Sequence, residues 1–277
     1  MKNLKWLMAL VIGMLAVVAC NSKKTEKPRV LVLYYSQTSN TKQVAEEIAT
    51  RVGADIEEVV PTNPYDGDFQ ATIERCMKER QEGVKAEIEP LKADISKYDV
   101  VFIGFPVWFG TYAPPIAALL ESIDLTGKKV VPFCTFGSGG LESSVKDLAE
   151  KQSGAEILPG YGVRAARMKA VPEEIDQFLK AGGFVEGECV KLEDFGEAHE
   201  ASEEEAAIFD AAVDGYPMIH AKAKTVASRA LPNGMEYLFT AEDLPRENAP
   251  QMPPMGPMKV YVTVVEGEAP VFTRVVR

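Results

Sequence analysis

The chain is poor in the residues that build disulfide frameworks, metal sites and hydrolytic triads. Its 277 residues include four cysteines and two histidines, and no two cysteines form a CxxC motif. Four cysteines are too few for a disulfide framework at this length, and the missing CxxC argues against a thiol redox pair or a zinc site. Both histidines, His199 and His220, lie in the last third of the sequence. We therefore expect no Ser-His-Asp triad and no multi-histidine metal site in the preceding two thirds.

Positive charge is also scarce. The chain has 30 lysines and arginines against 41 aspartates and glutamates, a formal charge of −11 and a pI near 4.9. This balance argues against a nucleic-acid binder, which needs a clustered cationic surface. Much of the acidity lies in residues 186–205, where nine acidic residues accompany one lysine. The segment predicts a solvated hinge or a docking site for a partner with a basic face.

The apolar run near the N-terminus is too short to cross a membrane. It extends from Trp6 to Ala19, 14 residues, whereas a transmembrane helix needs about 20. Lys2 and Lys5 precede it, as expected of a secretory signal peptide over residues 1–19.

The signal peptide ends in Val17-Val18-Ala19-Cys20, which resembles a bacterial lipobox. We expect Cys20 to be lipidated and residues 20–28 to form a polar tether. The protein would then lie in the cell envelope, anchored to the membrane by lipid and facing the periplasm or the exterior.

Residues 29–184 alternate strand-like and helix-like segments. Val30–Tyr35 and Asp99–Phe105 are continuous apolar runs, which are typical of strands buried on both faces. Five strands alternating with helices predict an α/β domain with a five-stranded, parallel, doubly wound sheet. The expected strands are 30–35, 54–60, 99–105, 129–135 and 156–163, and the expected helices are 41–52, 68–83, 113–123, 141–152 and 172–180.

The alternation stops at residue 185. Residues 185–204 are predicted to form an acidic linker, and residues 205–277 a small C-terminal domain of α+β or mostly β structure, to which the sequence assigns no function. The turn-like sequence Leu231-Pro232-Asn233-Gly234 separates its first two strands. The expected elements are a helix at 203–213 and strands at 219–230, 236–241, 259–265 and 270–276.

Three loops follow predicted strands at the sheet edge where doubly wound folds bind ligands. The first, Ser36–Thr41, leads directly into a helix. Its hydroxyls and the free N–H groups of the helix N-terminus suit a phosphate without any side-chain cation. No Walker lysine pattern is present, so a nucleoside triphosphate fits poorly. A Ser/Thr-rich turn with an N-cap has the same composition, and the residues alone leave both interpretations open.

The second and third loops suit a flat ligand. Gly104–Pro114 carries aromatic residues between glycines and prolines, and packing of Trp108 and Phe109 on the neighbouring helix is the alternative interpretation. Thr135–Gly140 offers backbone amides free of bulky side chains, or is simply a flexible turn. Each pattern is weak alone, but all three occur in order in the loops that a ligand would contact.

The run Val30–Thr41, with its Ser-x-Thr-x-Asn-Thr core, resembles the phosphate loop of flavodoxins. The Gly-x-Pro-x-Trp loop and the Thr-x-Gly-Ser-Gly-Gly loop resemble the two isoalloxazine loops of the flavodoxin-like family found in bacterial lipoproteins. The resemblance covers residues 29–184 and implies a short-chain flavodoxin-like domain that binds FMN non-covalently.

The resemblance assigns cofactor-binding residues to all three loops. The phosphate would be held by Ser36, Gln37, Thr38, Ser39, Asn40 and Thr41, with Gln37 and Ser39 contributing backbone amides. The ring would be flanked by Pro106, Val107, Trp108, Phe109 and Gly110. Its other edge would be lined by Thr135, Phe136, Gly137, Ser138 and Gly139.

The family implies electron transfer, here at the cell envelope and to a redox partner, with no catalytic side chain required. An NAD(P)H-dependent quinone or FMN reductase of the same fold remains an alternative, as does a non-catalytic binding module that has lost FMN. The reduction potential does not follow from the resemblance, because the three loops contain no acidic side chain that would lower it.

Two further motifs have more ordinary interpretations that we favour. Met252, Met255 and Met258 share the three-residue period of polyproline II and could bind Cu(I), but methionines also pack well against a sheet. Asp66–Thr72 partly resembles the sequence for covalent attachment of FMN to threonine, but an aspartate cap at the start of a helix explains it better.

Overall fold

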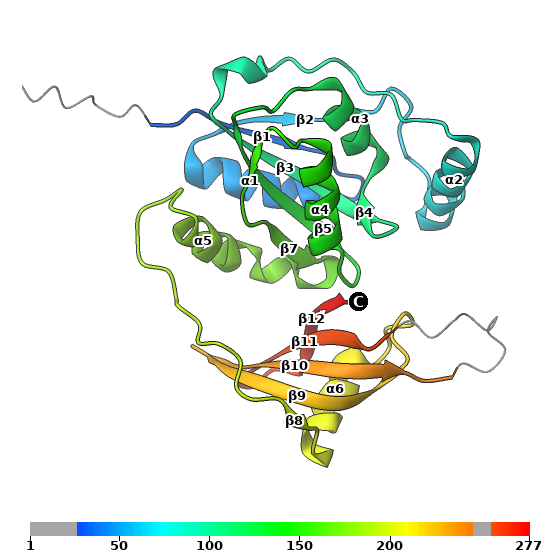
Figure 1. Ribbon diagram of the computed structural model, residues 1–277, viewed down its shortest axis with the longest axis vertical. Helices are drawn as coiled ribbons and strands as arrows, with labels where there is room; N and C mark the ends of the chain where they lie inside the picture. The colour runs from blue at the N-terminus through cyan, green and yellow to red at the C-terminus, as the bar shows by residue number, and fades with distance from the viewer. Residues whose placement is uncertain (1–26, 246–255) are drawn as a thin grey trace, which may run out of the picture.

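The computed structural model describes residues 27–245 and 256–277, which form two domains joined by an extended segment (Figure 1). The predicted signal peptide, the lipidation site Cys20, and Met252 and Met255 lie outside the described residues. Within the described ranges, no helix combines the length and apolar character needed to cross a bilayer.

The first domain is built on a parallel sheet with the strand order β2-β1-β3-β5-β6. β7 also pairs with β5, and every one of these pairings is parallel. The predicted five-stranded α/β fold is therefore confirmed. The strands are β1 (Val30–Tyr34), β2 (Asp55–Glu58), β3 (Val100–Trp108), β5 (Lys129–Phe136), β6 (Glu156–Ile157) and β7 (Tyr161–Arg164).

The predicted fifth strand is interrupted. Residues 158–160 separate β6 from β7, although both pair with β5. Pro159, which has no N–H group to donate to a neighbouring strand, lies within this gap. A Cβ on Gly160 would lie 2.8 Å from the carbonyl oxygen of Pro132, so the chain passes too close for a larger residue.

β1, β3 and β5 form the buried centre of the sheet, as their apolar runs predict. Gly104 in β3 lies beside the ring of Phe133 in β5, and a Cβ there would come within 2.1 Å of that ring. The missing side chain therefore makes room for Phe133, which is fully buried.

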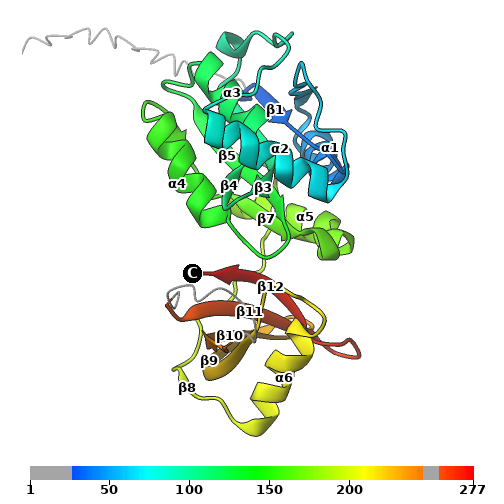
Figure 2. The same cartoon turned by 90° about the vertical axis from the view of Figure 1, so that its right-hand side faces the viewer.

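Two helices cover one face of the sheet (Figures 1 and 2). α1 (Asn40–Val52) and α5 (Val171–Ala181) bury Val44, Ile48 and Ile175 against the side chains of the central strands. α1 ends at a glycine in the left-handed conformation, a common helix stop.

Three helices cover the other face: α2 (Phe69–Glu82), α3 (Pro114–Ser122) and α4 (Leu141–Lys151). Asp68 caps α2 by accepting a hydrogen bond from the N–H of Ala71 at 2.8 Å. This cap confirms the interpretation of the Asp66–Thr72 motif as the start of a helix. Short 3₁₀ turns at Ile95–Lys97 and Ala165–Ala170 precede β3 and α5.

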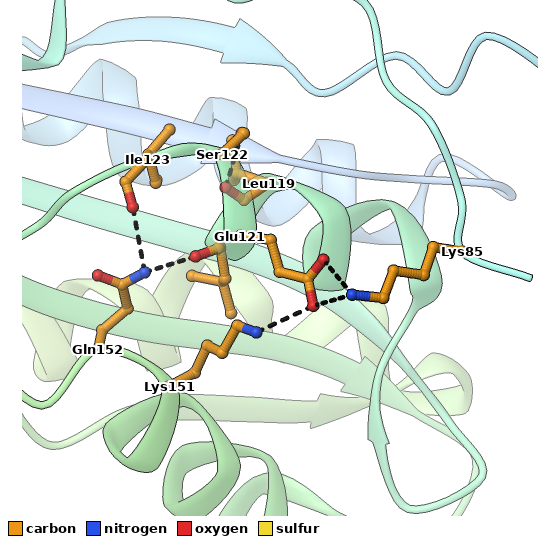
Figure 3. A network of polar contacts seen from close by, with 8 residues as sticks. Lys85, Leu119, Glu121, Ser122, Ile123, Lys151 and Gln152 are labelled. Atoms are coloured by element: carbon orange, nitrogen blue, oxygen red, sulfur yellow. Dashed lines mark hydrogen bonds and ion pairs between the residues drawn. The ribbon is translucent and has the colours of Figure 1, made fainter. Parts of the chain in front are cut away.

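Polar contacts hold the ends of α3 and α4 together (Figure 3). Glu121 accepts from Lys85 and from Lys151, each at 2.9 Å. Such exposed pairs contribute about 0–1 kcal/mol each. Gln152 is buried, and its amide donates to the carbonyl of Leu120 at 2.6 Å. Because it satisfies a buried backbone group, this bond matters more to the packing of the two helices than the exposed ion pairs do.

The second domain is an antiparallel sheet with the strand order β12-β11-β10-β9-β8 and a helix on one face (Figure 2). The predicted small α+β domain is confirmed, and so is the turn, because Leu231 pairs with Gly234 across a tight connection. β8 belongs to the end of the predicted acidic linker. The strands are β8 (His199–Glu200), β9 (Ala221–Leu231), β10 (Gly234–Asp243), β11 (Met258–Val265) and β12 (Val271–Val276).

The helix of this domain, α6 (Glu203–Val213), begins with a reciprocal capping box between Ser202 and Glu205. It buries Phe209 against the sheet, where its ring meets that of Phe239. Met258 is fully buried in the same apolar cluster, so the packing interpretation holds for this methionine.

Candidate functional site

The three predicted ligand loops meet at the carboxyl ends of β1, β3 and β5. The first loop approaches the start of α1 through Ser39, which has a φ of 65° and makes no side-chain cap. The N–H groups of the first helical turn have no intrahelical acceptor and are free to bind an anion. Within the described chain, the hydroxyl of Ser36 is buried and has no hydrogen-bond partner. The loop therefore offers one buried hydroxyl and a set of backbone donors.

Gln37 holds the first loop in place through its side chain. Its Nε2 donates to the carbonyl of Tyr65 at 2.9 Å and to Oγ1 of Thr72 at 2.7 Å. The sequence predicts only a backbone role for Gln37, because nothing in the motif indicates that Tyr65 and Thr72 lie beside it. Thr38 is exposed, and its hydroxyl accepts from the amide of Asn40 at 3.4 Å.

Thr41 and Thr135 join the first loop to the third. Their hydroxyl oxygens lie 2.8 Å apart, and both side chains are buried. The two hydroxyls bind each other and are buried beneath the loops. These two predicted cofactor residues therefore hold the first and third loops at a fixed spacing.

The second loop is a β-hairpin. β3 extends to Trp108 and pairs with β4 (Thr111–Tyr112), leaving a two-residue turn at Phe109 and Gly110. Both turn residues have positive φ, 53° and 83°, as required in a type I′ turn. This conformation is unusual for a bulky residue such as phenylalanine. The turn holds Phe109 at the tip of the hairpin, with its side chain about half exposed.

Trp108 belongs to a cluster of three aromatic rings. Its ring makes edge contacts with Tyr35, at 5.8 Å between centroids, and with Tyr65, at 5.3 Å. Burial raises the pKa of both tyrosines, so they stay neutral at physiological pH. Of the two aromatic residues at the end of this hairpin, Phe109 is the more exposed to solvent, and the guanidinium carbon of Arg80 lies 5.4 Å from its ring centroid.

The third loop faces the C-terminal domain as well as the ligand side. Gly137 is exposed and Phe136 is buried at the end of β5. The N–H of Val275 in β12 donates to the carbonyl of Ser138 at 2.7 Å. A Cβ on Gly139 would lie 2.1 Å from the carbonyl oxygen of Val275. Sequence reasoning missed this contact, because it treats the loop and the C-terminal domain as independent.

Contacts within the first domain hold the second and third loops against each other. A Cβ on Gly140 would lie 2.5 Å from the side chain of Val107, so the third loop lies directly against the second. The carbonyl of Pro106 accepts from the N–H of Ala113, which closes the base of the hairpin. The structure thus brings the predicted cofactor residues of all three loops to one edge of the sheet.

Residues 29–177, more than half of the chain, match the flavodoxin family. The chain belongs to that family. No curated protein matches this flavodoxin-family chain, whereas several solved structures resemble its first domain.

A flavoprotein from Bacteroides eggerthii is 30% identical over 54% of this chain and 96% of its own, with a TM-score of 0.47. One from Bacteroides uniformis is 26% identical over 55% and 99%, with a TM-score of 0.48. A flavoprotein from Lactobacillus acidophilus, solved in complex with FMN, is 29% identical over 49% and 93%, with a TM-score of 0.44. Each of the three matches covers only about half of this chain.

The hydroxyl pair beneath the loops predicts coupled effects on stability. Thr41→Val leaves the hydroxyl of Thr135 buried without its partner, so we expect a loss of about 1–3 kcal/mol in the free energy of unfolding. Thr135→Val should have a similar effect. The double variant removes both hydroxyls, so it should lose less unfolding free energy than the sum of the losses in the two single variants. Urea unfolding followed by tryptophan fluorescence measures all three variants, and strictly additive losses would contradict the coupling.

Proposed function

We propose that the chain binds FMN non-covalently in the three-loop site and carries electrons for a partner at the cell envelope. The observation that supports it most directly is the hydroxyl of Ser36, buried in the first loop without a partner among the described residues. Buried polar groups in native proteins are nearly always hydrogen-bonded, and a phosphate oxygen would supply the acceptor. The residues present therefore fit the cofactor that the family implies.

The phosphate would be held without a dedicated cation. The hydroxyl of Ser36 and the backbone N–H groups at the start of α1 are the available donors, together with the exposed hydroxyl of Thr38. Lys42, the nearest basic residue in the sequence, lies 3.9 Å from Glu46 and is partly neutralised by it. Binding of the phosphate therefore relies on hydrogen bonds and on the helix dipole.

The flavin ring would lie between the second and third loops. Phe109 presents an aromatic surface at the tip of the hairpin, and the loop at 137–139 presents backbone groups with little side-chain bulk. When bound, FMN supplies the electron-transfer chemistry. The chain's own residues would bind the cofactor, orient it and exclude water, and none of the side chains in the three loops is a carboxylic acid or a histidine.

Reconstitution with FMN tests the cofactor directly. We expect the full chain to remain yellow after gel filtration, with the flavin absorbance near about 450 nm. Ser36→Ala should raise the dissociation constant for FMN at least about tenfold, because a hydrogen bond to a charged group contributes about 1.5–3 kcal/mol. Riboflavin, which lacks the phosphate, should bind equally to both.

Ser153→Ala is the matched control for that substitution. Ser153 is exposed after α4, away from all three loops, and its variant should bind FMN as the parent chain does. A parent chain that elutes colourless would overturn the proposal and favour a binding module that has lost its cofactor.

The acidic segment supports transfer to a basic partner. Of its nine acidic residues, Glu186 and Glu188 are exposed between the two domains, close in sequence to the end of the flavodoxin domain. Complementary charge accelerates encounter between redox partners and weakens with salt. The segment therefore provides a docking surface that the nearly neutral flavin loops do not.

Two mixing experiments distinguish an electron carrier from a reductase. NADPH should leave the bound flavin oxidised, and rapid bleaching of the flavin absorbance would instead establish the reductase alternative.

The chemically reduced chain should pass electrons to a basic c-type cytochrome at a rate that falls with salt. Replacing Glu186 and Glu188 by glutamine should slow this transfer severalfold. The same change at the exposed Glu266 and Glu268, in the turn between β11 and β12, should have little effect.

Attachment to the envelope depends on Cys20. A diacylated cysteine would hold the domain at the membrane surface through the tether of residues 20–28. We expect labelled palmitate to be incorporated into the expressed chain and the protein to sediment with membranes. Cys20→Ala should abolish both, and labelling that persists in this variant would place the lipid elsewhere.

A further inference from the structure

The C-terminal domain lies against the edge of the parallel sheet that carries the ligand loops (Figures 1 and 2). The backbone part of the contact is made by β12, the edge strand of its sheet. The N–H of Val275 points away from β11 and donates to the carbonyl of Ser138. Loop and strand approach so closely at Gly139 that no side chain fits between them. The domain therefore contacts the very loop that is predicted to line the flavin.

A buried arginine forms the second part of this contact. Arg164, at the end of β7, is only 8% exposed. Its Nε donates to the carbonyl of Gly137 at 2.8 Å, and its Nη1 donates to the carbonyl of Phe272 in β12 at 2.9 Å. One guanidinium thus joins the ligand loop to the C-terminal domain through two backbone carbonyls.

Aromatic rings enclose the rest of the guanidinium. Its carbon lies 3.4 Å from the centroid of the Phe272 ring and 5.3 Å from that of Tyr216. The two rings also contact each other edge to face, with centroids 5.0 Å apart. Both belong to the C-terminal domain, which therefore shields Arg164 from water and contributes cation–π attraction.

The charge of Arg164 has no carboxylate partner among the described residues. The ion pairs nearby involve other side chains: Arg167 pairs with Glu174, and Arg274 lies 3.7 Å from Glu142. Burying an unpaired charge is costly, and an apolar residue could fill the same space without that cost. The carbonyl partners and rings stabilise the cation in place, but they leave its net positive charge beside the third loop.

We propose that the C-terminal domain is a working part of the flavin site, in which Arg164 and Val275 clamp the loop at 137–139 and the charge of Arg164 raises the reduction potential of the flavin. This inference rests on the proposed function. Reduction adds negative charge to the flavin, and a nearby cation in a medium of low dielectric stabilises that charge. The clamp also fixes the loop backbone before the cofactor binds, which lowers the entropy cost of binding. Arg164 is thus a positioning residue and a source of charge.

Substitutions at Arg164 in the full chain separate these two effects. Arg164→Met removes both the charge and the clamp, so we expect the dissociation constant for FMN to rise about tenfold and the midpoint potential to become more negative. Arg164→Lys keeps the charge but cannot reach both carbonyls, so it should retain the parent potential while losing affinity. Fluorescence titration gives the affinity, and equilibration with redox dyes gives the potential.

Arg167→Met is the matched control. Arg167 lies three residues further along the chain, and its charge is paired with that of Glu174. Its loss should leave both the affinity and the potential near the parent values. If Arg164→Met also matched the parent, or if the two methionine variants changed equally, the proposal would be wrong.

Val275→Pro tests the clamp from the other domain without altering charge. Val275 uses its N–H for Ser138 and not for the neighbouring strand, and proline is tolerated on an edge strand. We expect weaker FMN binding with an unchanged circular dichroism spectrum. If this variant bound FMN with the parent affinity, the contact between Val275 and Ser138 would not contribute to cofactor binding, and this part of the proposal would be wrong.

Hydrogen exchange in the apoprotein distinguishes failure of this inference from failure of the proposed function. Amides of residues 137–140 should exchange faster in Arg164→Met and in Val275→Pro than in the parent chain or in Arg167→Met, and the amide of Val275 should exchange faster in Arg164→Met. A parent chain that binds no FMN would overturn the proposed function while exchange still reports the clamp. Equal exchange in all four proteins would overturn the clamp itself.

Discussion

The loop between β5 and α4 must satisfy two neighbours with the same few backbone groups. On one side it presents amides at the edge of the parallel sheet, and on the other its Ser138 carbonyl accepts from β12 of the second domain. This double requirement limits the side chains the loop can carry. Gly139 has no room for a Cβ, and one on Gly140 would collide with Val107. The Gly-Ser-Gly-Gly sequence thus serves the junction between domains as well as the proposed ligand site.

The sequence predicts most of the first domain because its strongest patterns are local. The apolar runs of β1, β3 and β5 indicate strands buried on both faces, and each lies where it is expected. The ligand loops follow from their positions after these strands. The break at residues 158–160 is not predicted, because the sequence indicates one strand over 156–163, and Pro106 and Pro132 lie within unbroken strands.

The parts that escape prediction depend on contacts between distant residues. Arg164 and Phe272 are separated by 108 positions, and neither stands in a motif that would associate them. The side chain of Gln37 binds Tyr65 and Thr72, more than 25 residues further along the chain. The hairpin turn at Phe109 is not predicted for another reason. Phenylalanine rarely adopts a positive φ, so its local backbone preference argues against the turn that the structure contains.

The charge of the whole chain is a poor guide to the electrostatics of the site. The net charge of −11 is concentrated in the acidic segment at residues 186–205, outside the three loops. The loops contain no ionisable carboxylate, and the buried charge that contacts them is the cation Arg164. Interactions between exposed charges weaken over about 8–10 Å in physiological salt, whereas a buried charge is screened far less. A single enclosed guanidinium can therefore outweigh nine solvated carboxylates at the proposed flavin site, and the C-terminal domain provides that enclosure.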